Sequence, residues 1–307
     1  MKPTEERLDQ LREEAARSGQ TVAGTLLSYY GVPLLKPPVW TWEIPTYFFV
    51  GGAAGAASVL AAVAQLTGAD EDLVRDARWI AAAGAGLSGP LLIADLGRPE
   101  RFLNMLRVFK LQSPMSVGAW TVAAFGAAST AAAFADLVRR RTSLPVRLVA
   151  DAAGLVSAAT GLAMSTYTGV LLGATSIPVW SRHVRLLPFH FGASALGSAV
   201  SLLQLMGHDD DALNALGIGA AVFETMTGFQ LERTSDRESE PLRHGPTGIT
   251  TRLGGVFSGP IPLVLRLFGL RSRRARQAAA AATLLGSLIT RFAWVEAGKE
   301  SAKQSKP

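Results

Sequence analysis

The sequence predicts an all-α polytopic membrane protein with about eight transmembrane helices in a bundle, and three observations support this fold class. The chain is 49% hydrophobic and only 18% charged, whereas soluble chains carry about 25% charged residues, and its mean hydropathy is +0.25. Several uncharged runs reach the length of about 20 residues that a helix needs to cross the hydrocarbon core. Charged residues lie between these runs, so the runs lack the wet face that a long soluble helix requires.

Four of the predicted spans are long runs without charge, one is a shorter uncharged run, and three contain a charged residue. The uncharged runs cover residues 44–67, 111–135, 152–181 and 186–207. The run 79–94 is shorter and reaches spanning length if Arg78 and Asp95 lie at the membrane interfaces. The three remaining runs, each with one charged residue inside, are 212–231 with Glu224, 253–270 with Arg266 and 277–295 with Arg291. Eight spans follow, with seven as the alternative.

The charge pattern also predicts the organisation of the chain. Residues 1–40 form a polar N-terminal segment that lacks the apolar core of a signal peptide. Residues 41–296 form one transmembrane domain, and 297–307 form a polar tail. Arginines are dense in 139–147 and 271–276, which places these loops in the cytoplasm by the positive-inside bias and both termini outside.

Composition excludes several cofactors and partners. The chain has no cysteine, so it cannot ligate an iron–sulfur cluster or a cysteine-bound zinc. A membrane haem needs facing histidines, and only His190 lies well inside a run, so we expect no haem. A single histidine of this kind predicts a packing or interface role, with a functional role as the alternative. The net charge is +6, but the basic residues punctuate membrane runs and form no patch for nucleic acid.

Glycine and alanine dominate the first span, in GGAAGAAS at 51–58. Small residues four apart, Gly51 and Gly55, let helices approach closely in lipid. A dinucleotide-binding loop is the weaker alternative because no strand precedes the glycines.

Four segments together resemble one known family. They are WTWEIPTYFFVGGAAGA at 40–56, DLGRPERFLNML at 95–106, SPMSVGAW at 113–120 and IPVW at 177–180. In this order they resemble the NrfD / polysulfide reductase membrane-subunit family. The resemblance implies a multi-pass subunit of the cell (inner) membrane with eight helices and no metal of its own. It also implies a docked four-cluster ferredoxin-like iron–sulfur subunit, a catalytic oxidoreductase subunit, and exchange of menaquinone or ubiquinone with the bilayer.

Quinone exchange requires an apolar slot, donors for the carbonyl groups and a route for protons. The entrance of the first span offers Trp42, Glu43 and Tyr47. Glu43 and Tyr47 are four residues apart and share one helix face. The tryptophan also suits an aromatic belt at the interface. An acid fits such a belt poorly, so we expect Glu43 to exchange protons with the quinone.

Asp95 ends a predicted span, where a carboxylate opposes the helix dipole and borders the hydrocarbon. Arg98 and Arg101 follow closely and can compensate its charge. One interpretation is a structural latch at a helix–loop junction. The other, favoured by the resemblance, places Asp95 beneath the quinone head group as a proton relay, with Arg98 and Arg101 beside it.

The third span opens with Ser113, Pro114 and Met115. Ser113 suits a helix cap, because proline is well tolerated in a first helical turn. Ser113, Met115 and Trp120 are also candidates to line the quinone pocket.

Glu224 is an acid inside a predicted span, which is a functional-site hypothesis by default. Arg266 or Arg291 from the last two spans is its expected partner. The three residues predict either a proton path across the bilayer or a buried ion pair that fixes helix order.

The leading functional prediction is a membrane subunit of a respiratory oxidoreductase complex. It exchanges electrons between a partner iron–sulfur subunit and quinone, possesses no catalytic activity alone, and can couple the exchange to proton movement. A passive anchor for a soluble oxidoreductase is the first alternative. An ion or solute transporter is the second, weakened by the absence of a defensible inverted repeat.

Overall fold

The computed structural model describes residues 9–10, 13, 35–96, 98–139, 144–234, 236–268 and 272–304. Within the part from residue 35 onward, these residues form α-helices, two 3-10 helices (η1 and η2) and no strand. The elements are α3 (Glu43–Leu66), α4 (Glu71–Asp95), η1 (Pro99–Leu106), α5 (Pro114–Arg139), α6 (Leu144–Gly173), α7 (Pro178–Arg182), α8 (Leu186–Met206), α9 (Asp211–Arg233), η2 (Arg237–Leu242), α10 (Gly245–Ser258), α11 (Pro260–Phe268) and α12 (Arg273–Gln304). Most of the predicted polar segment 1–40 lies outside the described residues.

Six helices of the described part are long and apolar enough to cross a membrane: α3, α4, α5, α6, α8 and α12. Helix α9 and the pair α10–α11 are not among these six, and they complete the bundle at the positions of the other two predicted spans. The prediction of an all-α membrane protein is therefore confirmed.

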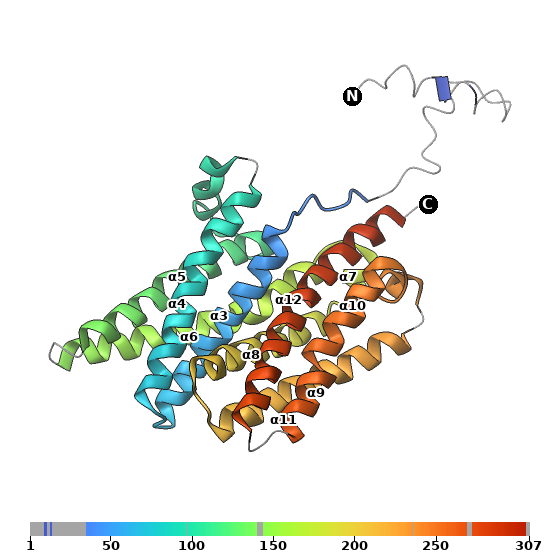
Figure 1. The fold of residues 1–307 in the computed structure, drawn as a ribbon. Helices are drawn as coiled ribbons and strands as arrows, with labels where there is room; N and C mark the ends of the chain where they lie inside the picture. The colour runs from blue at the N-terminus through green and yellow to red at the C-terminus, as the bar shows by residue number, and fades with distance from the viewer. Residues whose placement is uncertain are drawn as a thin grey trace.

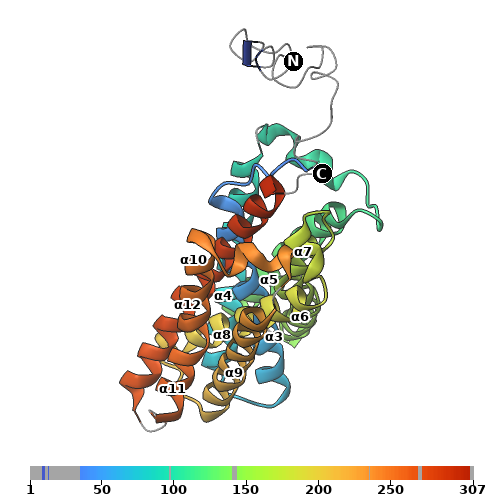
Figure 2. The ribbon, with the colours of Figure 1, turned by 90° about the vertical axis from the view of Figure 1, so that its right-hand side faces the viewer.

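The bundle has two halves that pack side by side (Figures 1 and 2). In the first half, α3 packs against α4 and α6, and α5 packs against the same two helices. In the second half, α8 and α10 pack against α12, α9 packs against α8, and α11 packs against both α9 and α12. Helices α3 and α8 join the halves, with α6 on α8 and α12 on α3.

Two predicted boundaries were wrong. The second span begins at Glu71, not at residue 79, because the Asp70 side chain caps the helix by accepting from the Asp72 N–H. The run 152–181 is not one helix, since α6 ends at Gly173 and Pro178 begins the short α7. The longer α4 includes charged residues such as Arg78. This buried arginine pairs with Asp136 of α5, with 2.6 Å between Arg78 Nη1 and Asp136 Oδ1.

The run 253–270, predicted as one span, is interrupted. Helix α10 ends at Ser258 and α11 begins at Pro260. Proline has no N–H to continue the hydrogen-bond ladder, and its ring crowds the preceding turn. The chain therefore turns at Gly259, where an added Cβ would lie 2.9 Å from the backbone nitrogen of Thr225 on α9. This break places the end of α10 in the interior of the second half.

The glycine-rich face of α3 packs against α6, as predicted. A Cβ added to Gly55 would lie 2.4 Å from the carbonyl oxygen of Gly161, and one added to Gly51 would lie 2.6 Å from the Met164 side chain. Close approach of the two backbones lets dispersion contacts hold helices together in lipid. The Ser58 hydroxyl donates to the Ser157 carbonyl across the same contact.

We call the end of the bundle that carries η1, α7 and η2 the α7 end; α3 begins there and α12 ends there (Figure 1). Trp40 stacks on Trp180 at this end, and the Trp180 indole N–H donates to the Trp294 carbonyl. At the opposite end, α5 and α11 end and α6 and α12 begin. The two arginine-rich segments predicted on one side of the membrane include these helix ends.

Candidate functional site

Glu43 and Asp95 lie together at the α7 end, although they are distant in sequence. Glu43 is the first residue of α3, and Asp95 is the last of α4. Thr41 connects them, since its N–H donates to Asp95 Oδ1 at 3.4 Å and its hydroxyl donates to Glu43. The described residues contain no ion pair between Asp95 and Arg98.

The remaining residues predicted for the first-half quinone pocket are spread over its surface and interior. Trp42, Met115 and Trp120 are exposed, and so is Arg98. The side chain of Arg101 lies outside the described residues. Tyr47 is buried and its hydroxyl lies 3.8 Å from Met164 Sδ. Ser113 Oγ accepts from the Ser116 N–H, which confirms its capping role. None of these side chains lines the pocket described next.

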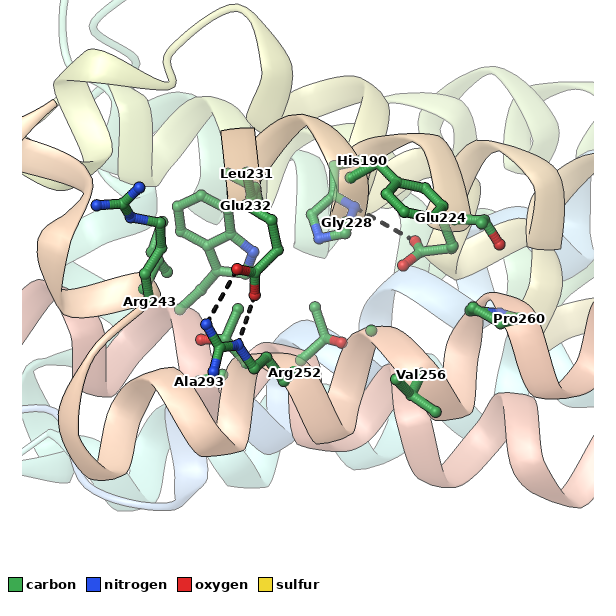
Figure 3. Close-up of a pocket in the computed structure, with 17 residues that line it drawn as sticks. His190, Glu224, Gly228, Leu231, Glu232, Arg243, Arg252, Val256, Pro260 and Ala293 are labelled. Atoms are coloured by element: carbon green, nitrogen blue, oxygen red, sulfur yellow. Dashed lines mark hydrogen bonds and ion pairs between the residues drawn. The ribbon is translucent and has the colours of Figure 1, made fainter. Parts of the chain in front are cut away.

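A well-formed pocket of about 180 Å³ lies instead in the second half, between α8, α9, α10 and α12 (Figure 3). Apolar side chains such as Leu231, Val256 and Trp294 line most of it. Gly228 of α9 and Gly255 of α10 also line it, and a Cβ added to either would meet no atom within 4 Å. The slot exists because glycine leaves open space where the two helices face each other.

The deep part of the pocket holds an acid and a histidine. Glu224 of α9 and His190 of α8 are both almost fully buried, and Glu224 Oε1 lies 3.4 Å from His190 Nδ1. The other carboxylate oxygen accepts from the Ser258 hydroxyl at 2.9 Å, at the end of α10. Glu224 Oε1, His190 Nδ1 and Thr290 Oγ1 have no aligned hydrogen-bond partner among the described residues. Three buried polar groups thus remain free to bind a ligand.

The predicted pairing of Glu224 with Arg266 or Arg291 is wrong as an ion pair. Arg291 lies near Glu224, but its guanidinium donates to the Phe191 carbonyl and lies 3.7 Å from the centre of the Phe191 ring. Arg266 is part of a separate cluster, described below. Glu224 contacts His190 instead, a histidine that the sequence indicated as a packing residue. Spacing along a chain does not show which helices touch, and this is why the partner was missed.

An exposed ion pair lies at the rim of the pocket, at the α7 end (Figure 3). Arg252 of α10 donates from Nε and Nη2 to the two carboxylate oxygens of Glu232 of α9, at 2.6 and 3.0 Å. This two-pronged geometry joins the helices above the glycine-lined slot. The cavity thus runs from a polar, exposed rim to the buried Glu224.

The described residues contain no group of three or more histidine, aspartate or glutamate side chains that could hold a metal ion. In the pocket, Glu224, His190 and Thr290 can form hydrogen bonds, and Glu224 and His190 can also exchange protons. A mainly apolar cavity with a few convergent polar groups is the usual form of a small-molecule site.

Comparison with known proteins adds the family. Residues 33–300 match the family model described as Polysulphide reductase, NrfD. No curated protein matches the chain. Since the match covers nearly all of the helical bundle, the chain belongs to the NrfD family of membrane subunits of oxidoreductase complexes.

Proposed function

We propose that this subunit exchanges electrons between a partner iron–sulfur subunit and quinone, and that the quinone head group binds in the pocket between α9 and α10. The observation that carries the proposal is an apolar slot that ends on three buried polar atoms without a hydrogen-bond partner among the described residues, Glu224 Oε1, His190 Nδ1 and Thr290 Oγ1. A cavity of about 150 Å³ accepts a benzene ring, so 180 Å³ admits one quinone ring.

Access from the bilayer supports the same ligand. Phe229 and Val256 line the slot and are 62% and 43% exposed. In a membrane these exposed apolar side chains face lipid tails, so the isoprenoid tail of a quinone can remain in the bilayer while its ring enters between α9 and α10. The slot is thus reached without crossing water.

The polar groups fit the chemistry of the ligand. Reduction of a quinone to a quinol consumes two electrons and two protons, and oxidation of the quinol releases them. Thr290 can donate to one carbonyl oxygen, and His190 or the protonated Glu224 can donate to the other. Glu224 is the residue that gains or loses a proton with each turnover. Electrons come from, or return to, a docked four-cluster ferredoxin-like subunit that serves a catalytic oxidoreductase subunit in the cell membrane.

The test is quinone turnover by the purified complex with a short-chain quinone. Gly255→Leu extends a side chain into the slot from a position where a Cβ meets no atom within 4 Å, so we expect it to abolish turnover and to displace bound quinone. Gly219→Leu is the matched control, because Gly219 lies on α9 outside the pocket and a Cβ there also meets open space. Glu224→Gln keeps the shape and should lower kcat by about 10²-fold or more, the usual contribution of a proton-transfer group.

Normal turnover in Gly255→Leu would overturn the assignment of the pocket. The acids of the first half, Glu43 and Asp95, are the competing proton-exchange groups at the α7 end. If Asp95→Asn abolishes turnover while Glu224→Gln does not, the quinone binds near α3 and α4 with Trp42, Tyr47, Arg98 and Ser113 as its neighbours. A passive anchor predicts that none of these variants changes turnover.

A further inference from the structure

A column of polar side chains runs along α8 from the pocket towards the opposite end. Its members are His190, Ser194, Ser198, Ser201 and Gln204, spaced three or four residues apart on one helix face and all buried. Ser287 of α12 joins it, with its hydroxyl 2.6 Å from that of Ser194 and 2.9 Å from that of Ser198. At 1.5 Å per residue, the column covers about 21 Å of the membrane thickness.

The column ends on Arg266, which lies in the last turn of α11 and is 0% exposed. Its guanidinium donates to Gln204 Oε1 at 2.8 Å, to Asn214 Oδ1 at 3.3 Å and to Ser201 Oγ at 3.4 Å. All three partners are neutral, and no acidic side chain of the described residues pairs with Arg266. The guanidinium also lies directly on Gly217 of α9, where a Cβ would be 2.4 Å from its central carbon.

An arginine remains protonated in a protein, so Arg266 places an unneutralised positive charge in the interior. The carbonyl groups at the end of α11 favour a cation there. Positive charges repel one another strongly where the dielectric constant is low. A fixed arginine in a narrow polar passage excludes protons and other cations for this reason.

The pocket rim offers the contrasting route. Glu224 and the exposed pair Glu232–Arg252 line the same cavity, so Glu224 communicates with the water at the α7 end. In the other direction, the serine column leads from the pocket to Arg266.

We propose that Glu224 exchanges protons with the α7 end only, because Arg266 closes the serine column against protons from the opposite end. The inference deepens the proposed function, since it assigns one side of the membrane to the protons of quinone turnover. It gives Arg266 the role of an electrostatic barrier, in place of a member of a continuous path across the bilayer.

Passive proton flux tests the barrier without quinone turnover. The purified complex is placed in vesicles with a pH dye inside, and a potassium diffusion potential drives protons. The wild-type complex should conduct no more than empty vesicles. Arg266→Gln removes the charge and should raise the flux about tenfold or more, whereas Arg266→Lys should leave it unchanged. Asn214→Asp, which neutralises the charge and keeps the guanidinium, should also raise the flux and covers the case in which Arg266→Gln does not fold.

A wild-type complex that conducts protons would overturn the inference. So would equal flux in Arg266→Gln, Asn214→Asp and the wild type, or an increase in Arg266→Lys as large as in Arg266→Gln. Because the assay uses no quinone, these outcomes are separate from those of the slot-filling variants. If the wild-type complex conducts no protons and Gly255→Leu turns over quinone normally, the quinone pocket is refuted while the role of Arg266 as a barrier stands.

Discussion

His183 shows how burial at a single residue creates pH sensitivity. His183 directly follows α7 in the chain. Its Nε2 atom lies 3.0 Å from the Ser239 hydroxyl of η2, and its ring packs against Trp294. Burial, reinforced by the neighbouring charge of Arg182, lowers the pKa of His183 to about 4, and Asp236 opposes the shift. His183 is therefore neutral in the folded chain at neutral pH.

The folded pKa of His183 lies below its ordinary value of 6.5, so the unfolded chain binds more protons between about pH 6.5 and pH 4. The stability contributed by neutral His183 is complete above this window and is lost as the pH falls through it, by at most about 3 kcal/mol. We expect His183→Gln, which keeps a hydrogen bond to Ser239 but does not titrate, to weaken this dependence. Thermal unfolding in detergent at pH 7, 5.5 and 4 measures the difference. Parallel pH profiles of the two proteins would contradict it.

At the scale of the element, helix ends and small residues position the site. The break at Gly259 and Pro260 ends α10 at Ser258, and the Ser258 hydroxyl then reaches Glu224 on α9. In the first half, glycine at the contact between α3 and α6 sets how closely the two helices approach.

Gly161→Leu should separate α3 from α6. A Cβ at this position would lie 2.0 Å from Ser58 Oγ and 2.7 Å from the Gly55 carbonyl oxygen. Backbone atoms cannot yield as a flexible side chain does, so we expect a loss of about 1–3 kcal/mol or more and a lower Tm in detergent. Gly126→Leu on α5 is the control, because a Cβ there meets open space. Equal Tm values for the two variants would contradict this account of the contact.

At the scale of the whole molecule, many large apolar side chains lie exposed on the surface of the bundle. Large hydrophobic side chains are exposed on α4, α5, α9 and α12, among them Leu87, Phe134, Met226 and Leu285. A soluble monomer rarely exposes apolar surface of this extent. The arginine-rich loop flanks lie at the opposite end from α7, which predicts that this end faces the cytoplasm.

The orientation can be measured directly because the chain has no cysteine of its own. Ser272→Cys lies between α11 and α12 at the opposite end, and Lys110→Cys lies between η1 and α5 at the α7 end. In intact spheroplasts we expect a membrane-impermeant thiol reagent to label Lys110→Cys and not Ser272→Cys. Both should react after permeabilisation. The reverse pattern would place the α7 end, and with it the protons of Glu224, on the cytoplasmic side.

The sequence by itself determined that this chain is a helical membrane protein of the NrfD family, because runs without charge and ordered motifs are local features of a chain. It also indicated Glu224, since an acid inside an apolar run is unusual wherever the run packs. Only the tertiary structure decided that Glu224 contacts His190 and lines a slot, that Arg266 lies in a separate cluster with neutral partners, and that Pro260 interrupts a span. These facts depend on which helix faces meet, and helices of similar apolar composition can pack in several ways until their glycines and buried polar groups select one.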